Sequence, residues 1–325
     1  MSQRQPNRVC GLKSAVRERP EPGRLSRLSR RNMPGLAILE APSGLGLASY
    51  GVQQLPSALL QLGLADGLGV RATRRVEAPT AGGEIDPATG VLNAAELASY
   101  SIGLADAVQE MLEDGEFPLI LGGDCSILLG SALALKRRGR HGLLFIDGNA
   151  DFFQPEANPN GEAASMDLAF ATGHGPAAVA DLERRGASIC EEDVVAFGWR
   201  DHKDQADYGS QPLPAATLSL DLPSIRRLGL DNALDLALAR LCDPRLDGFL
   251  IHLDADVLDD EVMPAVDYRI PGGLSPDELT HVLTCAVASG RAVGLEVAIY
   301  NPQLDPEAAA GAVLTEVLTA ALRHF

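Results

Sequence analysis

Residues 249–256 read FLIHLDAD, a short apolar run that ends in two aspartates one residue apart. Two other runs share this design: residues 117–126 read FPLILGGDCS, and residues 143–151 read LLFIDGNAD. Short apolar runs bounded by glycine and polar residues are typical of buried strands. We therefore expect three apolar strands whose carboxyl ends carry acidic side chains.

Similar apolar runs alternate with helical segments from Gly35 to the end of the chain, without an internal repeat. Such alternation predicts an α/β protein with one mostly parallel sheet and helices on both faces. Ligands of open α/β sheets bind beyond the carboxyl ends of the strands. The aspartates at these ends should therefore face one crevice: Asp124, Asp147, Asp254 and Asp256. Alternation within a strand would point Asp254 and Asp256 to the same face.

The chain of 325 residues has 27 Lys and Arg against 44 Asp and Glu, a net charge of −17 at pH 7. Residues 1–33 hold nine basic and two acidic residues, so residues 34–325 carry a net charge of −24. An acidic body without a basic patch argues against nucleic acid as a partner. It suits cations instead, either metal ions or a guanidinium-like small-molecule substrate.

The length leaves room for one large α/β domain, which we place at residues 34–325. Residues 1–33 are rich in Arg, Ser and Pro, and we expect a disordered basic tail or an over-called start with Met33 as the initiator. A mitochondrial-type targeting segment is the alternative, although Glu18 and Glu21 would interrupt its amphipathic helix. Five scattered cysteines without a CxxC pair, and no apolar run of membrane length, predict a cytoplasmic protein with no membrane partner.

Single aspartates at strand ends are commonly turn and cap residues. Here, however, five lie at the same ends of three apolar strands: Asp124, Asp147, Asp151, Asp254 and Asp256. Packed carboxylates repel one another unless a cation or a proton lies among them. The pattern therefore favours a divalent metal site.

These motifs resemble the ureohydrolase family of arginases, agmatinases and formiminoglutamases. GGDCS at 122–126 stands where that family has GGDHS, DGNAD at 147–151 where it has DAHxD, and LDAD at 253–256 where it has SxDxD. PGGLS at 271–275 and Asn301-Pro302 match a loop and a turn of the family. The resemblance extends over residues 35–325.

The resemblance implies a three-layer α/β/α sandwich with two Mn²⁺ ions at the strand ends. It implies hydrolysis of a C–N bond of a guanidino, formimino or related small molecule by a metal-activated hydroxide. It also implies a homo-oligomer, either a trimer or a hexamer. One metal would be bound by Cys125, Asp147, Asp151 and Asp254, and the other by Asp147, Asn149, Asp254 and Asp256. Asp151 would in addition accept a hydrogen bond from the hydroxide.

Both histidine ligands of the family are replaced here, by Cys125 and Asn149. A thiolate is a soft ligand, so Zn²⁺ or Fe²⁺ becomes an alternative to manganese. The amide oxygen of Asn149 is a weak ligand, and we expect the site that contains it to be the weaker one. In the purely structural alternative, Cys125 is a small buried hydrophobe and Asn149 shapes the turn.

The substrate side also departs from the family. Ile299 stands where arginases and agmatinases carry the glutamate that binds the guanidinium, and Glu296 would have the opposite side-chain parity. The loop after Asp151 lacks the family's shuttle histidine. Candidate substitutes, both catalytic and substrate-binding, are Glu162 and Asp167; further substrate contacts would be Asn160 and His202. Alternatively, Glu162 caps a helix that begins around Ala163, and His202 is a solvated loop histidine.

The sequence thus predicts a metal-dependent hydrolase of the arginase and agmatinase type. Two alternatives stay open. One is a catalytically silent protein of this fold that binds a ligand or partner in the acidic crevice. The other is a hydrolase that uses a single, softer metal on another amide or amidine.

Overall fold

The computed structural model describes residues 34–70, 72–80, 82–323 and 325, so the tail expected at residues 1–33 lies outside the described residues. Its named strands form one eight-stranded sheet in the order β2-β1-β3-β8-β7-β4-β5-β6, and every pair is parallel. This confirms the predicted parallel sheet. The strands are β1 (Gly35–Glu40), β2 (Thr73–Arg75), β3 (Glu116–Leu121), β4 (Gly142–Ile146), β5 (Val194–Phe197), β6 (Leu218–Leu220), β7 (Phe249–Asp254) and β8 (Ala292–Ala298).

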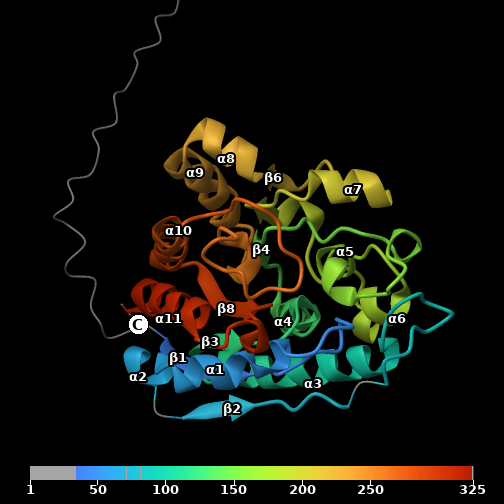
Figure 1. Ribbon diagram of the computed structural model, residues 1–325, viewed down its shortest axis with the longest axis horizontal. Coiled ribbons are helices and arrows are strands. Elements are labelled where there is room, and N and C mark those ends of the chain that lie inside the picture. The colour runs from blue at the N-terminus through green and yellow to red at the C-terminus, as the bar shows by residue number, and fades with distance from the viewer. Residues whose placement is uncertain (1–33, 71, 81, 324) are drawn as a thin grey trace, which may run out of the picture. The chain divides into compact units, whose positions relative to one another are not determined.

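Helices cover both faces of this sheet (Figure 1). In the described residues they are α1 (Leu55–Gln61), α2 (Leu64–Leu68), α3 (Ala94–Glu113), α4 (Leu128–Arg138), α5 (Asp167–Ala171), α6 (Ala177–Ala180), α7 (His202–Tyr208), α8 (Leu222–Leu228), α9 (Leu230–Leu241), α10 (Pro276–Ala288) and α11 (Ala309–Leu322). Two separate hydrophobic clusters lie between the layers, one under α1, α9, α10 and α11 and the other under α3, α4 and α5. The fold is therefore the three-layer α/β/α sandwich.

The strands supply both cores because successive side chains point to opposite faces. In β3, Leu119 and Leu121 join the cluster under α11, whereas Ile120 between them joins the cluster under α3. The central strands are buried along almost their whole length, which explains their continuous apolar sequence. The edge strands β2 and β6 have three residues each and are partly exposed, so no apolar run marks them in the sequence.

Two local details differ from the sequence expectations. Strand β7 ends at Asp254, and Asp256 lies in the following 3₁₀ turn η7 (Ala255–Val257), so strand alternation does not set the direction of Asp256. The helix expected around Ala163 is a single 3₁₀ turn, η4 (Ala163–Ser165), and Asp167 opens the next helix, α5. Both segments lie in loops that border the crevice, where contacts with other parts of the chain outweigh the helix or strand propensity of the local sequence.

The loop after β3 passes very close to the loop after β1. A Cβ atom on Gly123 would lie 1.7 Å from the carbonyl oxygen of Ser43, while the amide of Asp124 donates to that same oxygen at 3.0 Å. The Asp124 carboxylate accepts hydrogen bonds from the amides of Ser126 and Gly46 and from the Ser43 hydroxyl. Asp124 therefore holds these two loops together, and its oxygens are engaged there rather than in the crevice.

This close approach predicts a large effect of one added methyl group. Gly123→Ala should lower the free energy of unfolding by more than about 2 kcal/mol, because the clash is with backbone and cannot be relieved by a rotamer change. Gly103→Ala in the middle of α3 is the matched control: its Cβ meets nothing within 4 Å. It should stabilise the protein by up to about 1 kcal/mol through helix propensity. Urea unfolding of both variants measures the difference, and equal effects would refute the packing argument.

Candidate metal centre

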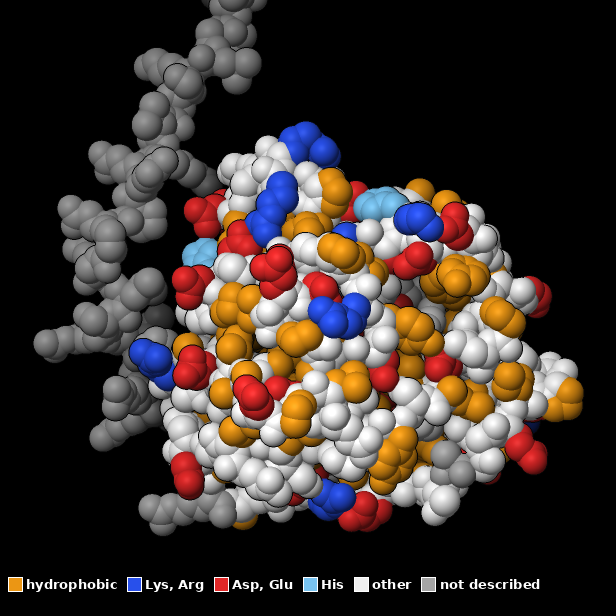
Figure 2. Space-filling model, in the orientation of Figure 1, with side chains coloured by type: hydrophobic (Ala, Val, Ile, Leu, Met, Phe, Trp, Pro, Cys, Tyr) orange, Lys and Arg blue, Asp and Glu red, His pale blue; other side chains and the backbone are white. Residues whose placement is uncertain are grey.

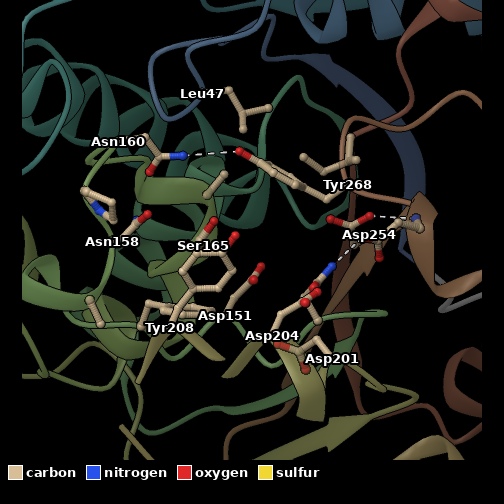
Figure 3. A pocket seen from close by; sticks show the side chains of 17 residues that line it. Leu47, Asp151, Asn158, Asn160, Ser165, Asp201, Asp204, Tyr208, Asp254 and Tyr268 are labelled. Carbon is tan, nitrogen blue, oxygen red and sulfur yellow. Dashed lines mark hydrogen bonds between the residues drawn. The ribbon is translucent and has the colours of Figure 1, made fainter. Parts of the chain in front are cut away.

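A cavity of about 440 Å³ opens beyond the carboxyl ends of β4 and β7 (Figure 3). Its walls come from the loops after β1, β4, β5, β7 and β8. The residues that line it include Asn149, Asp151, Asn158, Asn160, Ser165, Asp201, Asp204, Tyr208, Asp254, Asp256, Tyr268 and Ile299. On the face of the molecule shown in Figure 2, acidic side chains are widespread, and Lys and Arg occur singly rather than as a patch.

The floor of the cavity is a cluster of buried carboxylates. Asp147 follows β4 and Asp254 ends the neighbouring strand β7, so the parallel sheet places them next to each other. Asp151 lies beside them, and burial together with mutual repulsion raises the pKa of all three carboxyl groups well above the ordinary value. The Oδ2 atom of Asp147 is buried without a hydrogen-bond partner. This charge distribution favours binding of a cation.

Cys125 opens the 3₁₀ turn η2 (Cys125–Ile127) after β3 and points into this cluster. Its Sγ atom lies 2.8 Å from Oδ2 of Asp254, and ligand atoms of Cys125, Asp147 and Asp254 all lie within 4.8 Å of one another. Burial and the nearby Asp254 raise the pKa of the thiol. Three converging ligand atoms and an unpaired carboxylate oxygen fit a divalent metal ion at this position.

The other predicted metal position is built differently. The Nδ2 atom of Asn149 donates to Oδ2 of Asp256 at 2.6 Å, and the amide of Gly148 donates to Oδ1 at 2.8 Å. Burial raises the pKa of Asp256, but the guanidinium of Arg200 opposes this shift. Both oxygens of Asp256 are thus satisfied within the chain, so Asn149 and Asp256 fit a second ion less well than the cluster around Cys125.

Of the predicted substrate contacts, Asn160 lines the cavity and Glu162 does not. The Glu162 carboxylate is buried behind the wall, where it accepts hydrogen bonds from the Ala48 amide, from Nδ2 of Asn160 and from the Tyr268 hydroxyl. Asn160 also donates to Tyr268, as the dashed line in Figure 3 marks. Glu162 therefore fixes the two side chains that face the cavity. It is the residue before η4, but its side chain makes no capping bond.

The structure does not bring Asp167 or His202 to the cavity either. Asp167 is completely buried at the start of α5, with Oδ1 accepting from the Leu168 amide and Oδ2 facing His252 of β7. His202 opens α7 on the outside, where its Nε2 lies 2.9 Å from Asp221 and its ring lies against Trp199. Asp167 thus lies beneath the floor, and His202 belongs to a surface contact.

Several cavity residues were not singled out by the sequence, notably Asp201 and Tyr268. Burial raises the pKa of Asp201 to about 6, and its Oδ2 atom has no hydrogen-bond partner. Its position after Arg200 in the strand-to-loop segment is the only signal that could have marked it. Ile299 does lie at the cavity, with φ at 73°, an unusual value for a β-branched residue. Glu296 is buried on β8 and does not line the cavity. Strand alternation does not set this difference from Ile299, because β8 ends at Ala298.

The comparisons with known proteins agree with this geometry. Residues 40–322 match the model of the arginase family. The chain belongs to this family. The arginase of Staphylococcus aureus (strain MRSA252) is 28% identical over 281 residues, which cover 83% of this chain and 91% of that protein. Family membership supports a metal-dependent hydrolase.

Solved structures place the fold in the same family. The arginase of Bacillus caldovelox has a TM-score of 0.78 and 26% identity, covering 89% of this chain and 98% of its own. The formimidoylglutamase of Bacillus subtilis subsp. subtilis str. 168 has a TM-score of 0.68 over 91% of this chain and 88% of its own; at 19% identity it shows the fold alone. Among the described helices, none combines the length and apolarity needed to cross a membrane.

The repulsion among the clustered aspartates predicts that the metal-free protein becomes less stable as the pH rises. Because Asp147, Asp151 and Asp254 have raised pKa values, the native state binds more protons than the unfolded state. The stability that these extra protons confer is complete below a pH of about 4, the ordinary pKa of carboxyl groups in the unfolded chain. It is lost as the pH rises through the raised pKa values of the folded protein. In chelator, the melting temperature should therefore fall between about pH 5 and pH 8, and saturating metal should reverse the trend because its ligands must be deprotonated.

Asp151→Asn isolates the effect, because no hydrogen bond of the Asp151 side chain is found in the described residues and asparagine tolerates its φ of 43°. The variant should stabilise the metal-free protein at pH 8 by about 0.5–2 kcal/mol. Asp124→Asn, the control, should destabilise it because Asp124 accepts three hydrogen bonds. A metal-free Asp151→Asn protein that is less stable than wild type at pH 8 would contradict the repulsion.

Proposed function

We propose that this protein is a metal-dependent hydrolase that cleaves a C–N bond of a guanidino, formimino or related small molecule. The observation that carries the proposal is the convergence of Cys125, Asp147 and Asp254 beneath an open cavity, in a chain of the arginase family. Asp151 lines that cavity directly. A cluster this acidic and this buried costs stability unless a cation is bound, so it is best explained by function.

Cys125, Asp147, Asp151 and Asp254 would hold one divalent ion, and Asp147, Asn149, Asp254 and Asp256 would hold a second, weaker one. The family resemblance favours Mn²⁺, while the thiolate of Cys125 favours Zn²⁺ or Fe²⁺. When bound, the metal would supply Lewis acidity and lower the pKa of water to near neutrality. The substrate carbon would have to lie above the floor, within reach of Asp151.

The chain's own residues would then position the substrate and move protons. Asp151 would accept a hydrogen bond from the attacking water. Asp201, whose pKa is about 6, would exchange a proton near neutral pH, a task suited to a group poised at the working pH. Asn160 and Tyr268 would bind the substrate on the opposite wall, with Glu162 fixing both. Asp167 is buried beneath the floor, so it would not contact the substrate.

The substrate is inferred from what faces the cavity. A guanidinium beside Ile299 would have no carboxylate partner there, a loss of roughly 2–5 kcal/mol for a desolvated ion pair. Asp201 and Asp204 on another wall would still favour a cationic or neutral molecule over an anionic one. We therefore propose a substrate other than arginine, such as an N-modified guanidine, a formimino compound or another amidine.

Turnover assays with protein loaded with Mn²⁺, Zn²⁺, Co²⁺ or Fe²⁺ test this proposal. The panel of substrates consists of arginine, agmatine, guanidinobutyrate, formiminoglutamate and N-modified guanidines. We expect the best turnover on a compound other than arginine. Ile299→Glu should raise kcat/KM for arginine at least tenfold by supplying the missing carboxylate, whereas Ile299→Leu should not. A wild-type kcat/KM for arginine of about 10⁴ M⁻¹s⁻¹ or more would refute the substrate proposal.

A hydrolase with a single metal is the second candidate function, favoured by the hydrogen bonds that already satisfy Asp256. A catalytically silent, ligand-binding protein is the outcome if no compound is turned over with any of the four metals. The panel separates these possibilities when the bound metal is counted in the same samples.

A further inference from the structure

A second group of potential ligands lies beneath the cavity floor. It consists of Cys125, Asp167 at the start of α5 and His252 on β7, all completely buried. One atom from each, the sulfur, a carboxylate oxygen and an imidazole nitrogen, lies within 4.8 Å of the other two. Cys125 is also part of the cluster with Asp147 and Asp254, so its sulfur is common to both groups.

Two of these atoms lack hydrogen-bond partners although they are inaccessible to solvent. They are Nε2 of His252 and Oδ2 of Asp167. They face each other at 3.9 Å, too far apart for a hydrogen bond. Two ligand atoms at 2.0–2.1 Å from a tetrahedral zinc ion lie about 3.3 Å apart, so a small shift would let both contact one ion. Buried polar atoms without partners are rare in proteins and call for an explanation.

The imidazole of His252 is held from two other sides. Its Nδ1 lies 2.7 Å from Oε1 of Glu296, which faces it across the β7–β8 pair. Its ring stacks on Phe145 of β4, with centroids 4.8 Å apart and planes within 6°. Donation from Nδ1 to a carboxylate fixes the tautomer whose Nε2 carries a lone pair. A carboxylate behind the ligating imidazole is also the usual support of a metal-bound histidine.

We infer that Cys125, Asp167 and His252 form an additional divalent metal position beneath the cavity floor, joined to the position of the proposed function through the Cys125 sulfur. Thiolate, imidazole and carboxylate together are a ligand set for Zn²⁺. The Cys125 thiolate and the Asp167 carboxylate would be the anionic ligands of this buried position. The inference rests on the proposed function only in that both positions use Cys125.

Metal counting on the full-length protein tests the position. After chelation, reconstitution with Zn²⁺ and removal of weakly bound metal, we expect two zinc ions per chain in wild type, one in each position that uses Cys125. The weaker position at Asn149 and Asp256 should not retain zinc. We expect one zinc ion in His252→Gln and in Asp167→Asn. His141→Gln is the matched control, because His141 is also buried, and its Nδ1 also lacks a partner, but it precedes β4 at the opposite end of the sheet. It should keep two zinc ions. Circular dichroism of the chelated variants shows whether they fold.

X-ray absorption at the zinc edge, recorded for wild type and His252→Gln, provides a second measurement. The ligands proposed for the floor include no histidine, but His281 lies beside Cys285 on the surface. Imidazole scattering combined with zinc–sulfur scattering that is present in wild type and lost in His252→Gln would therefore come from His252. Absence of imidazole scattering, or a zinc count in His252→Gln equal to that of wild type, would overturn the inference. A zinc count of one in wild type would overturn it as well.

These outcomes are independent of the proposed function. A protein that binds two zinc ions but hydrolyses no compound of the panel would contradict the proposed activity and leave the additional metal position standing. Conversely, an active protein with one metal and no imidazole scattering would keep the activity and remove the additional position.

Discussion

Electrostatic repulsion among buried aspartates at the end of the sheet is the constraint on which the functional region depends. Asp147, Asp151 and Asp254 are buried close together at the floor of the cavity, so they resist being charged at the same time without a cation, and burial and mutual repulsion raise their pKa values. The rest of the fold has to hold these groups in place against this repulsion. A protein accepts this cost where binding of a metal ion, and the chemistry that follows, compensates for it.

The sheet order explains how the groups meet. Strands β3, β8, β7 and β4 are neighbours in the sheet. Cys125 and Asp147 follow the ends of β3 and β4, while Glu296 and His252 lie on β8 and β7. The sheet therefore brings these four residues close together although they are far apart in the sequence. The loops are fixed separately: Asp124 ties the loop after β3 to the loop after β1, and Arg200 donates to the carbonyls of Asp256, Leu258 and Ile270. These hydrogen bonds hold the loops around a centre whose buried negative charges are not balanced within it.

Much of this arrangement could be predicted from the sequence, because buried strands and the residues at their ends leave a local pattern. The parallel sheet, the three layers and the place of Ile299 at the cavity followed from such patterns or from the family resemblance. The directions of Glu162, Asp167 and His202 did not, because they lie in short turns whose course is set by packing against other loops. The sequence did not mark His252, because it lies within an apolar run. Only the structure shows that its Nδ1 atom contacts Glu296 and that its Nε2 atom and Oδ2 of Asp167, at the start of α5, have no hydrogen-bond partner.

In the proposal made above, the metal centre of this chain is built around the Cys125 sulfur rather than around Asn149 and Asp256. A crystal of the zinc-reconstituted protein, measured at the zinc absorption edge, tests it most directly through an anomalous difference map. We expect peaks within bonding distance of Cys125, one toward Asp147 and Asp254 and one toward Asp167 and His252. Peaks confined to the neighbourhood of Asn149 and Asp256, or no peak in the cluster at all, would contradict it.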